Sequence, residues 1–398
     1  MLATTAAGEN ANPFGVQSRA DAAQRMIVLA VEQGIASLPP TSGQSFSYEY
    51  DATGDTYRKS EQLGPTAFRS TQTIAPGHLT VRFAESFFDA AQSLGPIDYT
   101  VVGPQYAATL PGYCTRFGLT ASAEVALTNL SATYGIAKGM DVSINVPLVL
   151  SDTHASETFT TNDPTSGDVA VIPCDKLGSF IGQHTLTLAS RDFSAVQVPG
   201  GHVRFNDGTH FGLGRISVGG KVKLYSLPQA QFAFAPEFFF PSPNQAEFAG
   251  SDSAAIAPRV IGQLNVRDLI RLHTDIAYQY DFTYKELSGF VWNAGMSVPF
   301  TTVSRPVTVD AGVGGTRFNQ GITWTPGKPP DYVDDLGRVI SFQSAGNNQL
   351  GNTFVDFLGG VKIAITPAFV MSGAVDVPLN AEGFRPVAVG TLALELYL

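Results

Sequence analysis

The stretch YGIAKGMDVSINVPLVL at residues 134–150 decides the fold class of this chain. After a tight turn, Met140 and Val142 alternate with Asp141 and Ser143, and the alternation continues to the end of the stretch. A period of two places successive side chains on opposite faces of a β-strand. The pattern recurs in later segments, several of which carry charges on the polar face. A sheet that is apolar on one face and charged on the other is typical of a membrane β-barrel.

The composition agrees with a membrane barrel and excludes two other classes. Charged residues make up 15% of the 398 residues, whereas soluble domains usually contain roughly 25%. No segment approaches the ~20 consecutive apolar residues that a membrane helix needs, so a helical membrane protein is excluded. The net charge of −10 argues against a nucleic-acid partner, because proteins that bind nucleic acids carry basic faces. Residues 1–10 lack the basic start and apolar core of an export signal, so we expect a mature form.

Twelve alternating segments are predicted as strands of an all-β, transmembrane antiparallel barrel. Each is close to the ~9–11 residues that a tilted membrane strand needs. The predicted strands are 79–88, 119–134, 140–150, 215–226, 230–240, 258–266, 271–282, 287–299, 306–318, 353–365, 368–379 and 384–398.

The predicted connections alternate between tight turns, such as 135–139 and 366–367, and mostly long loops, such as 89–118 and 151–214. Outer-membrane barrels have short periplasmic turns and long extracellular loops. Their sheet must close, because an open edge in lipid would leave backbone groups unpaired. We therefore expect this chain in the outer membrane of a Gram-negative-type bacterium, in contact with the lipid bilayer and lipopolysaccharide.

The two cysteines, Cys114 and Cys174, fall in the first and second predicted long loops. Both loops are on the extracellular side by the parity of the strands. An isolated pair of cysteines in an oxidising compartment usually forms a disulfide. We therefore predict a Cys114–Cys174 disulfide, and two free buried thiols are the alternative.

Residues 1–76 are predicted to form a unit separate from the barrel at 77–398. Within them, 18–37 has the apolar stripe of an amphipathic helix with Ser18 as its N-cap. A short strand is predicted around 47–50. This unit is interpreted either as a plug within the lumen or as a periplasmic element docked on the end of the barrel.

Charged residues on the polar faces are predicted to face the lumen. A charge on the lipid face near the midplane would cost ~2–4 kcal/mol. The predicted lining is either a polar pore of modest ion selectivity or an ion-pair network that holds the barrel shut. A barrel of this size lies between filled and open barrels, so both interpretations stand. The predicted lumen-facing residues are Arg82, Glu124, Asp141, Arg215, Lys221, Lys223, Glu237, Arg259, Arg271, His273, Asp275, Asp310, Asp356, Lys362, Arg385 and Glu395.

Signals for catalysis, metals and cofactors are weak. The six histidines have no metal-ligand spacing, and we expect no metal, no cofactor and no enzymatic activity. His273 beside Asp275 suggests an acid–base pair, with an interior hydrogen bond as the preferred interpretation. The acidic stretches 163–168 and 331–335 suggest calcium binding, with solvated loop charge as the default. Aromatic residues near strand ends, Phe88 and Phe318 among them, are interpreted as interfacial girdles. A hydrophobic path past Phe239 is the alternative.

Several short motifs resemble a family of outer-membrane barrels, the phenol meta-pathway or transporter-like proteins. They are Tyr134-Gly135-Ile136, Val146-Pro147-Leu148, Gly212-Leu213-Gly214 before Ile216, and Phe240-Pro241. The resemblance covers about residues 79–398 and implies a barrel of about twelve strands that passes small, often hydrophobic molecules, with no catalytic residue. The chain departs from the family pattern in Arg215, where an acidic residue is expected, and in its terminal Leu398.

The leading functional hypothesis is an outer-membrane channel for the passive passage of small molecules, hydrophobic ones among them. The alternative is a structural or adhesive surface barrel with a sealed lumen that acts through its long extracellular loops. A barrel enzyme and a soluble all-β protein are weaker alternatives. The identity of the solute, and whether the chain forms a homo-oligomer or binds a surface partner, stay open.

Overall fold

The computed structural model describes residues 46–51, 56–102, 114–162, 185–192, 208–227, 229–242, 251–266, 269–300, 305–321, 323–324, 332–333, 339–344, 348–349, 351–383 and 385–398. The predicted helix at 18–37, the acidic stretch 163–168 and Cys174 lie outside the described residues, and with Cys174 the predicted disulfide. Among the described residues, no helix is both long enough and apolar enough to cross a membrane.

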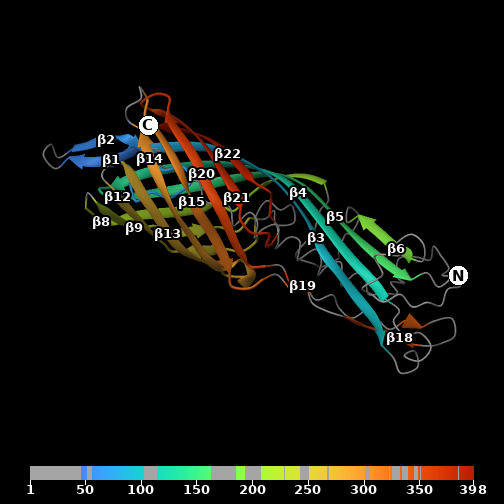
Figure 1. Cartoon of the computed structure of the whole chain (residues 1–398). Helices are drawn as coiled ribbons and strands as arrows, with labels where there is room; N and C mark the ends of the chain where they lie inside the picture. Colours follow the sequence, from blue (N-terminus) through green and yellow to red (C-terminus); the bar gives the residue numbers. More distant parts are fainter. Residues whose placement is uncertain are drawn as a thin grey trace.

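The predicted fold is confirmed: twelve antiparallel strands close into a barrel, three of them in two pieces (Figure 1). In the final pairing, β22 lies beside β3 with Glu395 opposite Arg82, which closes the ring. The barrel strands are β3 (Leu79–Val102), β4 (Cys114–Ala137), β5 (Met140–Asn162), β7 (Gly208–Leu213) with β8 (Ser217–Ser226), β9 (Ala230–Phe234) with β10 (Glu237–Phe239), β11 (Ala255–Ala257) with β12 (Arg259–Val266), β13 (Ile270–Asp281), β14 (Gly289–Phe300), β15 (Val307–Phe318), β20 (Thr353–Ala364), β21 (Phe369–Pro378) and β22 (Val389–Tyr397).

Shorter elements lie outside the ring. β1 (Phe46–Asp51) and β2 (Thr56–Leu63) form a separate two-stranded sheet, and β1 contains the short strand predicted around 47–50. The other short elements are β6 (Thr185–Asp192) beside β5, β16 (Thr323–Trp324) beside β19 (Asn348–Gln349), β17 (Tyr332–Val333) beside β18 (Val339–Ser344), and the 3-10 turn η4 (Lys285–Leu287).

The first three barrel strands are much longer than predicted. β3 and β4 stay paired as far as Thr100 and Cys114, and β5 continues to Asn162, so the predicted loops 89–118 and 151–214 begin too early. Figure 1 shows these strands projecting beyond the rest of the barrel. Beyond the predicted strand ends, β3, β4 and β5 remain paired with one another as an antiparallel sheet. The apolar alternation used for prediction marks only the part of a strand that lies in lipid.

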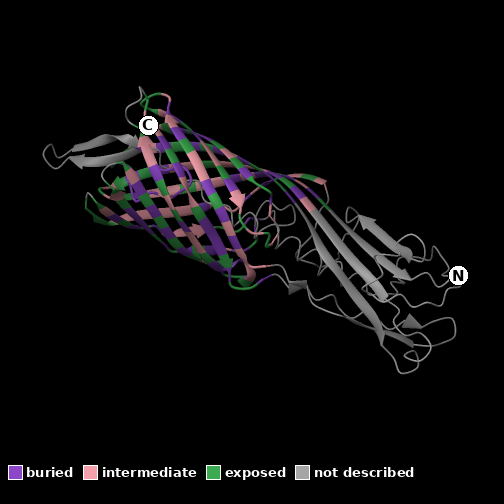
Figure 2. Ribbon diagram, in the orientation of Figure 1, coloured by how far each residue is buried: buried purple, intermediate pink, exposed green. Residues whose placement is uncertain are grey.

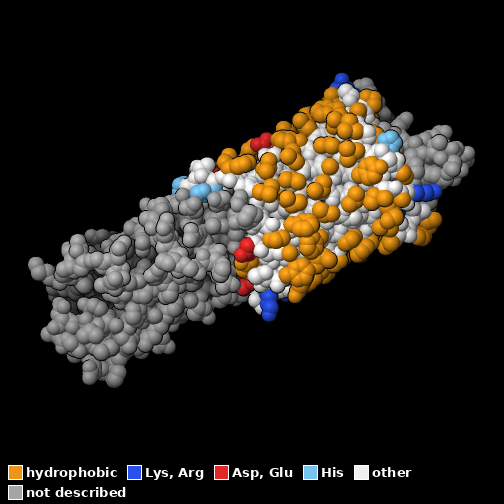
Figure 3. All heavy atoms as spheres, turned by 180° about the vertical axis from the view of Figure 1, so that it is seen from behind, with side chains coloured by type: hydrophobic (Ala, Val, Ile, Leu, Met, Phe, Trp, Pro, Cys, Tyr) orange, Lys and Arg blue, Asp and Glu red, His pale blue; other side chains and the backbone are white. Residues whose placement is uncertain are grey.

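The strands alternate in burial as the sequence alternates in polarity (Figure 2). In β13, Leu272 and Ile276 are 42% and 48% exposed, whereas His273 and Asp275 are 3% and 2% exposed. Hydrophobic side chains cover the visible outer face, and the charged ones on that face lie toward its edges (Figure 3). A closed barrel that is apolar outside and charged inside belongs in an outer membrane of the Gram-negative type.

The two ends of the barrel differ. One end carries the tight connections 138–139 and 365–368 and the terminal Leu398, and we call it the turn end. The opposite end carries the projecting strands β3 to β5 and the connection 379–388, and we call it the loop end.

Candidate functional site: the lumen and its inner segment

Residues 64–76, between β2 and β3, lie inside the barrel, and we call them the inner segment. Its side chains are almost completely buried: Phe68 and Ile74 are 1% exposed and Thr71 is 0% exposed. The exceptions are Arg69, with a side chain that is 23% exposed, and Pro76 at the end of the segment, which is exposed. The segment belongs to no strand, so its position depends on its contacts with the barrel wall.

The inner segment begins against β20 and β15. The Lys362 ammonium group donates a hydrogen bond of 2.8 Å to the carbonyl oxygen of Pro65. The backbone N–H of Thr66 donates to the carboxylate of Asp310. Lys362 and Asp310 are 1% and 2% exposed, so two charged groups of the wall are satisfied in part by the backbone of the segment.

Phe68 occupies a slot in the wall of β13, β14 and β15. Its ring stacks on the His273 imidazole with centroids 6.1 Å apart. The floor of the slot is made by Gly295 and Gly312, which lie opposite each other on β14 and β15. A Cβ atom at Gly295 or Gly312 would lie 2.2 or 2.6 Å from Cζ of Phe68. Only glycine at these two positions leaves room for the ring.

The segment next reaches β8 and β5 through Gln72 and Ile74. The ammonium group of Lys221 donates to the Gln72 carbonyl oxygen at 2.9 Å, and that of Lys223 donates to the Gln72 Oε1 at 3.1 Å. The backbone N–H of Ile74 donates to the Asp141 carboxylate at 3.3 Å. Three predicted lumen-facing residues are therefore brought together around the segment.

The inner segment ends against β4. A Cβ atom at Gly135 would lie 2.1 Å from the Ala75 carbonyl oxygen, and the Gly77 N–H donates to the Gly135 carbonyl oxygen at 2.9 Å. Ala75 also shares a hydrophobic cluster with Leu63 and Val370. The segment thus follows the inner wall from β20 round to β4 and brings its two ends together, so it occupies the lumen near the turn end.

Ion pairs hold the middle of the charged wall. The Arg69 guanidinium lies 2.8 Å from the Glu237 carboxylate, which also accepts a hydrogen bond from Ser217. Arg259 and Asp275 form a second pair, with side chains that are 5% and 2% exposed. Asn293 completes this pair by donating to both oxygens of Asp275.

The Arg259–Asp275 pair leads to a stability prediction. We expect Asp275→Ala to destabilise the barrel by about 3–5 kcal/mol, because it leaves a buried guanidinium without its partner. The measurement is the temperature at which the purified protein loses its folded mobility on unheated SDS gels. Asp89→Ala, at an exposed position on β3, is the control and should leave that temperature unchanged. Equal temperatures for both variants would contradict the prediction.

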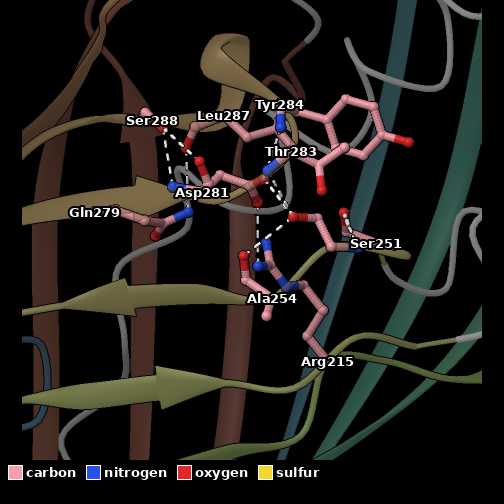
Figure 4. A network of polar contacts seen from close by, with 10 residues as sticks. Arg215, Ser251, Ala254, Gln279, Asp281, Thr283, Tyr284, Leu287 and Ser288 are labelled. Carbon is pink, nitrogen blue, oxygen red and sulfur yellow. Dashed lines mark hydrogen bonds and ion pairs between the residues drawn. The ribbon is translucent and has the colours of Figure 1, made fainter.

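A second polar network lies at the loop end (Figure 4). The Asp281 carboxylate accepts hydrogen bonds from Ser253 at 2.5 Å, from the Tyr284 N–H at 2.8 Å and from Arg215 at 3.2 Å. The Asp281 N–H donates to Ser288 at 2.9 Å. The network joins β13 to the connections on either side of it, so it fixes this part of the rim. Arg215, predicted from the sequence to face the lumen, pairs with Asp281 in this network.

Arg385 and Asp356 form another pair near the loop end. The Arg385 guanidinium also lies 5.0 Å from the ring centroid of Phe354, which makes an edge-on contact with Phe318. Both phenylalanines are buried, at 0% and 2% exposed. Phe318 therefore belongs to the interior and not to the aromatic girdle predicted for it.

The predicted lumen residues fall into three groups. Glu124 is exposed, and the partly buried residues are Arg215, Lys221, Lys223, Glu237 and Arg385. The others are buried and belong to the inward face: Arg82, Asp141, Arg259, Arg271, His273, Asp275, Asp310, Asp356, Lys362 and Glu395.

The prediction for Glu124 is wrong. Its neighbours Ala123 and Val125 are the buried residues of β4, at 1% and 3% exposed, whereas Glu124 itself is exposed. Glu124 is in register with Asp89 and Asp152 on the outer face. Near the edge of the apolar band a charge costs little, about 0–1 kcal/mol, so the rule that placed Glu124 inside does not apply there.

His273 and Asp275 do not form an acid–base pair with each other. His273 Nε2 lies 2.7 Å from the Ser297 hydroxyl, whereas Asp275 bonds to Arg259 and Asn293. Each therefore has a partner in the barrel interior. Among the described residues, no group of three or more His, Cys, Asp or Glu side chains is placed to hold a metal ion.

The opposite side of the inner wall is uncharged and mostly apolar. On β3, β4, β5 and β22 the buried residues toward the loop end are small or hydrophobic, apart from the hydroxyl residues Ser86, Ser151 and Thr153, in contrast to the charged residues of β8 to β20. They include Ala84, Phe88, Ala90, Ala123, Val125, Val149, Val389 and Ala393. Phe88, predicted to belong to a girdle, lies on this inner side, so the lumen has one charged and one apolar wall.

Comparisons with known proteins give only distant resemblances. No protein-family model matches the sequence, and no curated protein matches it. Solved structures that resemble it include an outer membrane channel from Pseudomonas putida F1, with 9% identity, a TM-score of 0.42 and coverage of 85% of this chain and 100% of that one. A second is a Pseudomonas aeruginosa FadL homologue, with 9% identity, a TM-score of 0.34 and coverage of 80% of this chain and 90% of that one. A third is the CymD monoaromatic hydrocarbon channel, with 11% identity, a TM-score of 0.35 and coverage of 82% of this chain and 89% of that one. These resemblances are too weak to carry an argument.

Proposed function

We propose that this protein is an outer-membrane channel for the passive passage of small molecules, hydrophobic ones among them, and that the inner segment closes it. The observation that carries the proposal is the attachment of the inner segment. Residues 64–76 lie in the lumen but contribute no strand to the barrel sheet. Hydrogen bonds to side chains and one ring slot attach them, and such contacts can be exchanged for water without breaking the sheet.

The two-sided lumen supports the choice of solute. A hydrophobic molecule gains free energy from contact with apolar surface, and the buried face of β3, β4 and β22 supplies it in Phe88, Val125 and Val389. The charged wall opposite is paired within itself, as in Arg259–Asp275. The path that we propose therefore follows the apolar side.

The proposal also assigns separate roles to the two parts of the chain. We propose that residues 1–76 act as a closure unit and residues 77–398 as the barrel. All twelve strands of the ring begin at or after Leu79, and β1 and β2 pair only with each other. Short turns are periplasmic in barrels of this kind, so the inner segment, which follows β2, enters the barrel from the periplasmic side.

One observation favours the second candidate, a sealed structural or adhesive barrel. The inward-facing charges are buried in ion pairs, as an interior that holds the barrel shut requires. The projecting strands β3, β4 and β5 would then carry a surface for partners.

Solute entry into proteoliposomes separates the two candidates. With the closing segment removed by deletion of residues 1–76, we expect a neutral aromatic solute, benzyl alcohol, to enter faster than it enters protein-free liposomes. Entry at the protein-free rate, together with partner binding that is lost when 91–121 is shortened, would favour the sealed barrel.

A further inference from the structure

A buried carboxylate on β21 stands apart from the other carboxylates of the lumen. Asp376 is 6% exposed, and its Oδ1 is buried without a hydrogen-bond partner among the described residues. Nor does any described residue form an ion pair with it. Other inward carboxylates have a cation: Glu237 has Arg69, Asp275 has Arg259, Asp281 has Arg215 and Asp356 has Arg385.

The residues paired directly with Asp376 in the sheet are apolar. In the sheet it is paired with Leu358 on one side and Val389 on the other, which are 1% and 4% exposed. The neighbouring pair Gly390–Phe87 places Phe88 beside Val389, and Phe88 is paired in turn with Val125. Asp376 therefore projects from the charged side of the barrel into the start of the apolar wall, two residues from the loop end of its strand.

A carboxyl group in this position either holds a proton or, when ionised, needs a cationic partner. Burial of an unpaired charge costs several kcal/mol, and the described part of the wall supplies no cation to Asp376. An ammonium group provides both the opposite charge and hydrogen-bond donors, and such charge-assisted bonds are about twice as strong as neutral ones. The apolar residues alongside offer contact to the body of the same molecule.

We propose that Asp376 and the apolar wall beside it form a binding site for a small hydrophobic amine, with the ammonium group on the carboxylate and the apolar body against Phe88 and Val389. This inference rests on the proposed function and specifies its solute class. Asp376 lies two residues from the loop end of β21. Its sheet neighbour Leu358 packs against Ala67 and Phe68 of the inner segment, so the site lies directly beside that segment. A solute that enters from the loop end meets Asp376 where the inner segment begins to fill the lumen.

The test uses the full-length protein in detergent, with benzylammonium as the probe and benzyl alcohol as its neutral counterpart, both followed by equilibrium dialysis. We expect the protein to bind benzylammonium at least about tenfold more tightly than benzyl alcohol, which corresponds to about 1.4 kcal/mol, because only the ammonium group forms a charge-assisted hydrogen bond with the carboxylate. Asp376→Asn should remove this preference and leave the affinity for benzyl alcohol within about twofold. Asp89→Asn, at an exposed position one residue from Phe88 but on the outer face, is the matched control and should bind like the unaltered protein.

Two outcomes would overturn the inference. One is an unaltered protein that does not prefer the amine, a result that needs no variant and is independent of folding. The other is an Asp376→Asn protein that keeps the preference. If benzyl alcohol crosses proteoliposomes while the amine preference is absent, the site fails and the channel stands. If no solute crosses, even without residues 1–76, the channel itself fails.

Discussion

Removal of residues 1–76 is expected to convert a closed barrel into one that conducts ions. The deletion takes away the inner segment and its contacts with Lys362, Asp310 and Gln231, while all the strands of the ring remain. The charged groups that bound the segment then face water. We expect discrete single-channel steps in planar bilayers and benzyl alcohol entry more than an order of magnitude faster than for the full chain.

A shorter deletion separates the inner segment from the rest of the unit. Removal of residues 1–45 alone leaves β1, β2 and the inner segment in the chain, so it controls for the loss of mass at the N-terminus. The full deletion should raise conductance above that of this control, because only the full deletion removes Phe68 and Gln72. A folded 77–398 barrel without conductance or solute entry would contradict both the closure and the channel.

Phe68→Ala is expected to release the inner segment without shortening the chain. Truncation of a buried phenylalanine costs about 3–5 kcal/mol, and here it empties the slot formed by His273, Gly295 and Gly312. The docked state should therefore lose stability relative to the released state by two to three orders of magnitude in population. We expect faster amide hydrogen exchange at residues 64–76 and more frequent channel openings.

The matched control is Phe83→Ala, which makes the same truncation on the outer face of β3, where Phe83 is 41% exposed. Exchange at residues 64–76 should stay slow in this control. Unchanged exchange in Phe68→Ala would show that the polar contacts of Gln72 and Thr66 suffice to hold the segment. Gly312→Ala provides an independent approach, since its Cβ would meet the ring of Phe68.

Much of the barrel could be predicted from alternation, because lipid and lumen impose opposite polarity on successive residues. The predicted turn between β4 and β5 and the strand at 271–282 agree closely with the structure. The predicted strand ends and side-chain directions are wrong where a strand leaves the lipid, because lipid and lumen no longer impose opposite polarity there. β3 runs on to Val102, and Glu124 faces outward, because strand residues beyond the apolar band are free of this constraint.

The position of the inner segment could not be predicted from the sequence, because the contrast between lipid and lumen does not act on it. Residues 64–76 have no period, since each contacts a different strand of the ring and no single face is presented to lipid. The sequence signal that indicates such a segment is a run of mostly small and polar residues between Pro65 and Pro76, directly before the first membrane strand. The orphan oxygen of Asp376 could not be found either, because its lack of a cation depends on which side chains three strands bring together.

The meeting of Leu63 and Ala75 in one hydrophobic cluster constrains the order of assembly. A segment whose two ends leave by the same opening can be inserted as a folded-back loop, with no chain terminus to thread through the ring. The twelve strands can therefore zip together in the membrane first, and residues 64–76 can seat afterwards from the periplasmic compartment. This geometry allows the barrel to assemble before its lumen is closed.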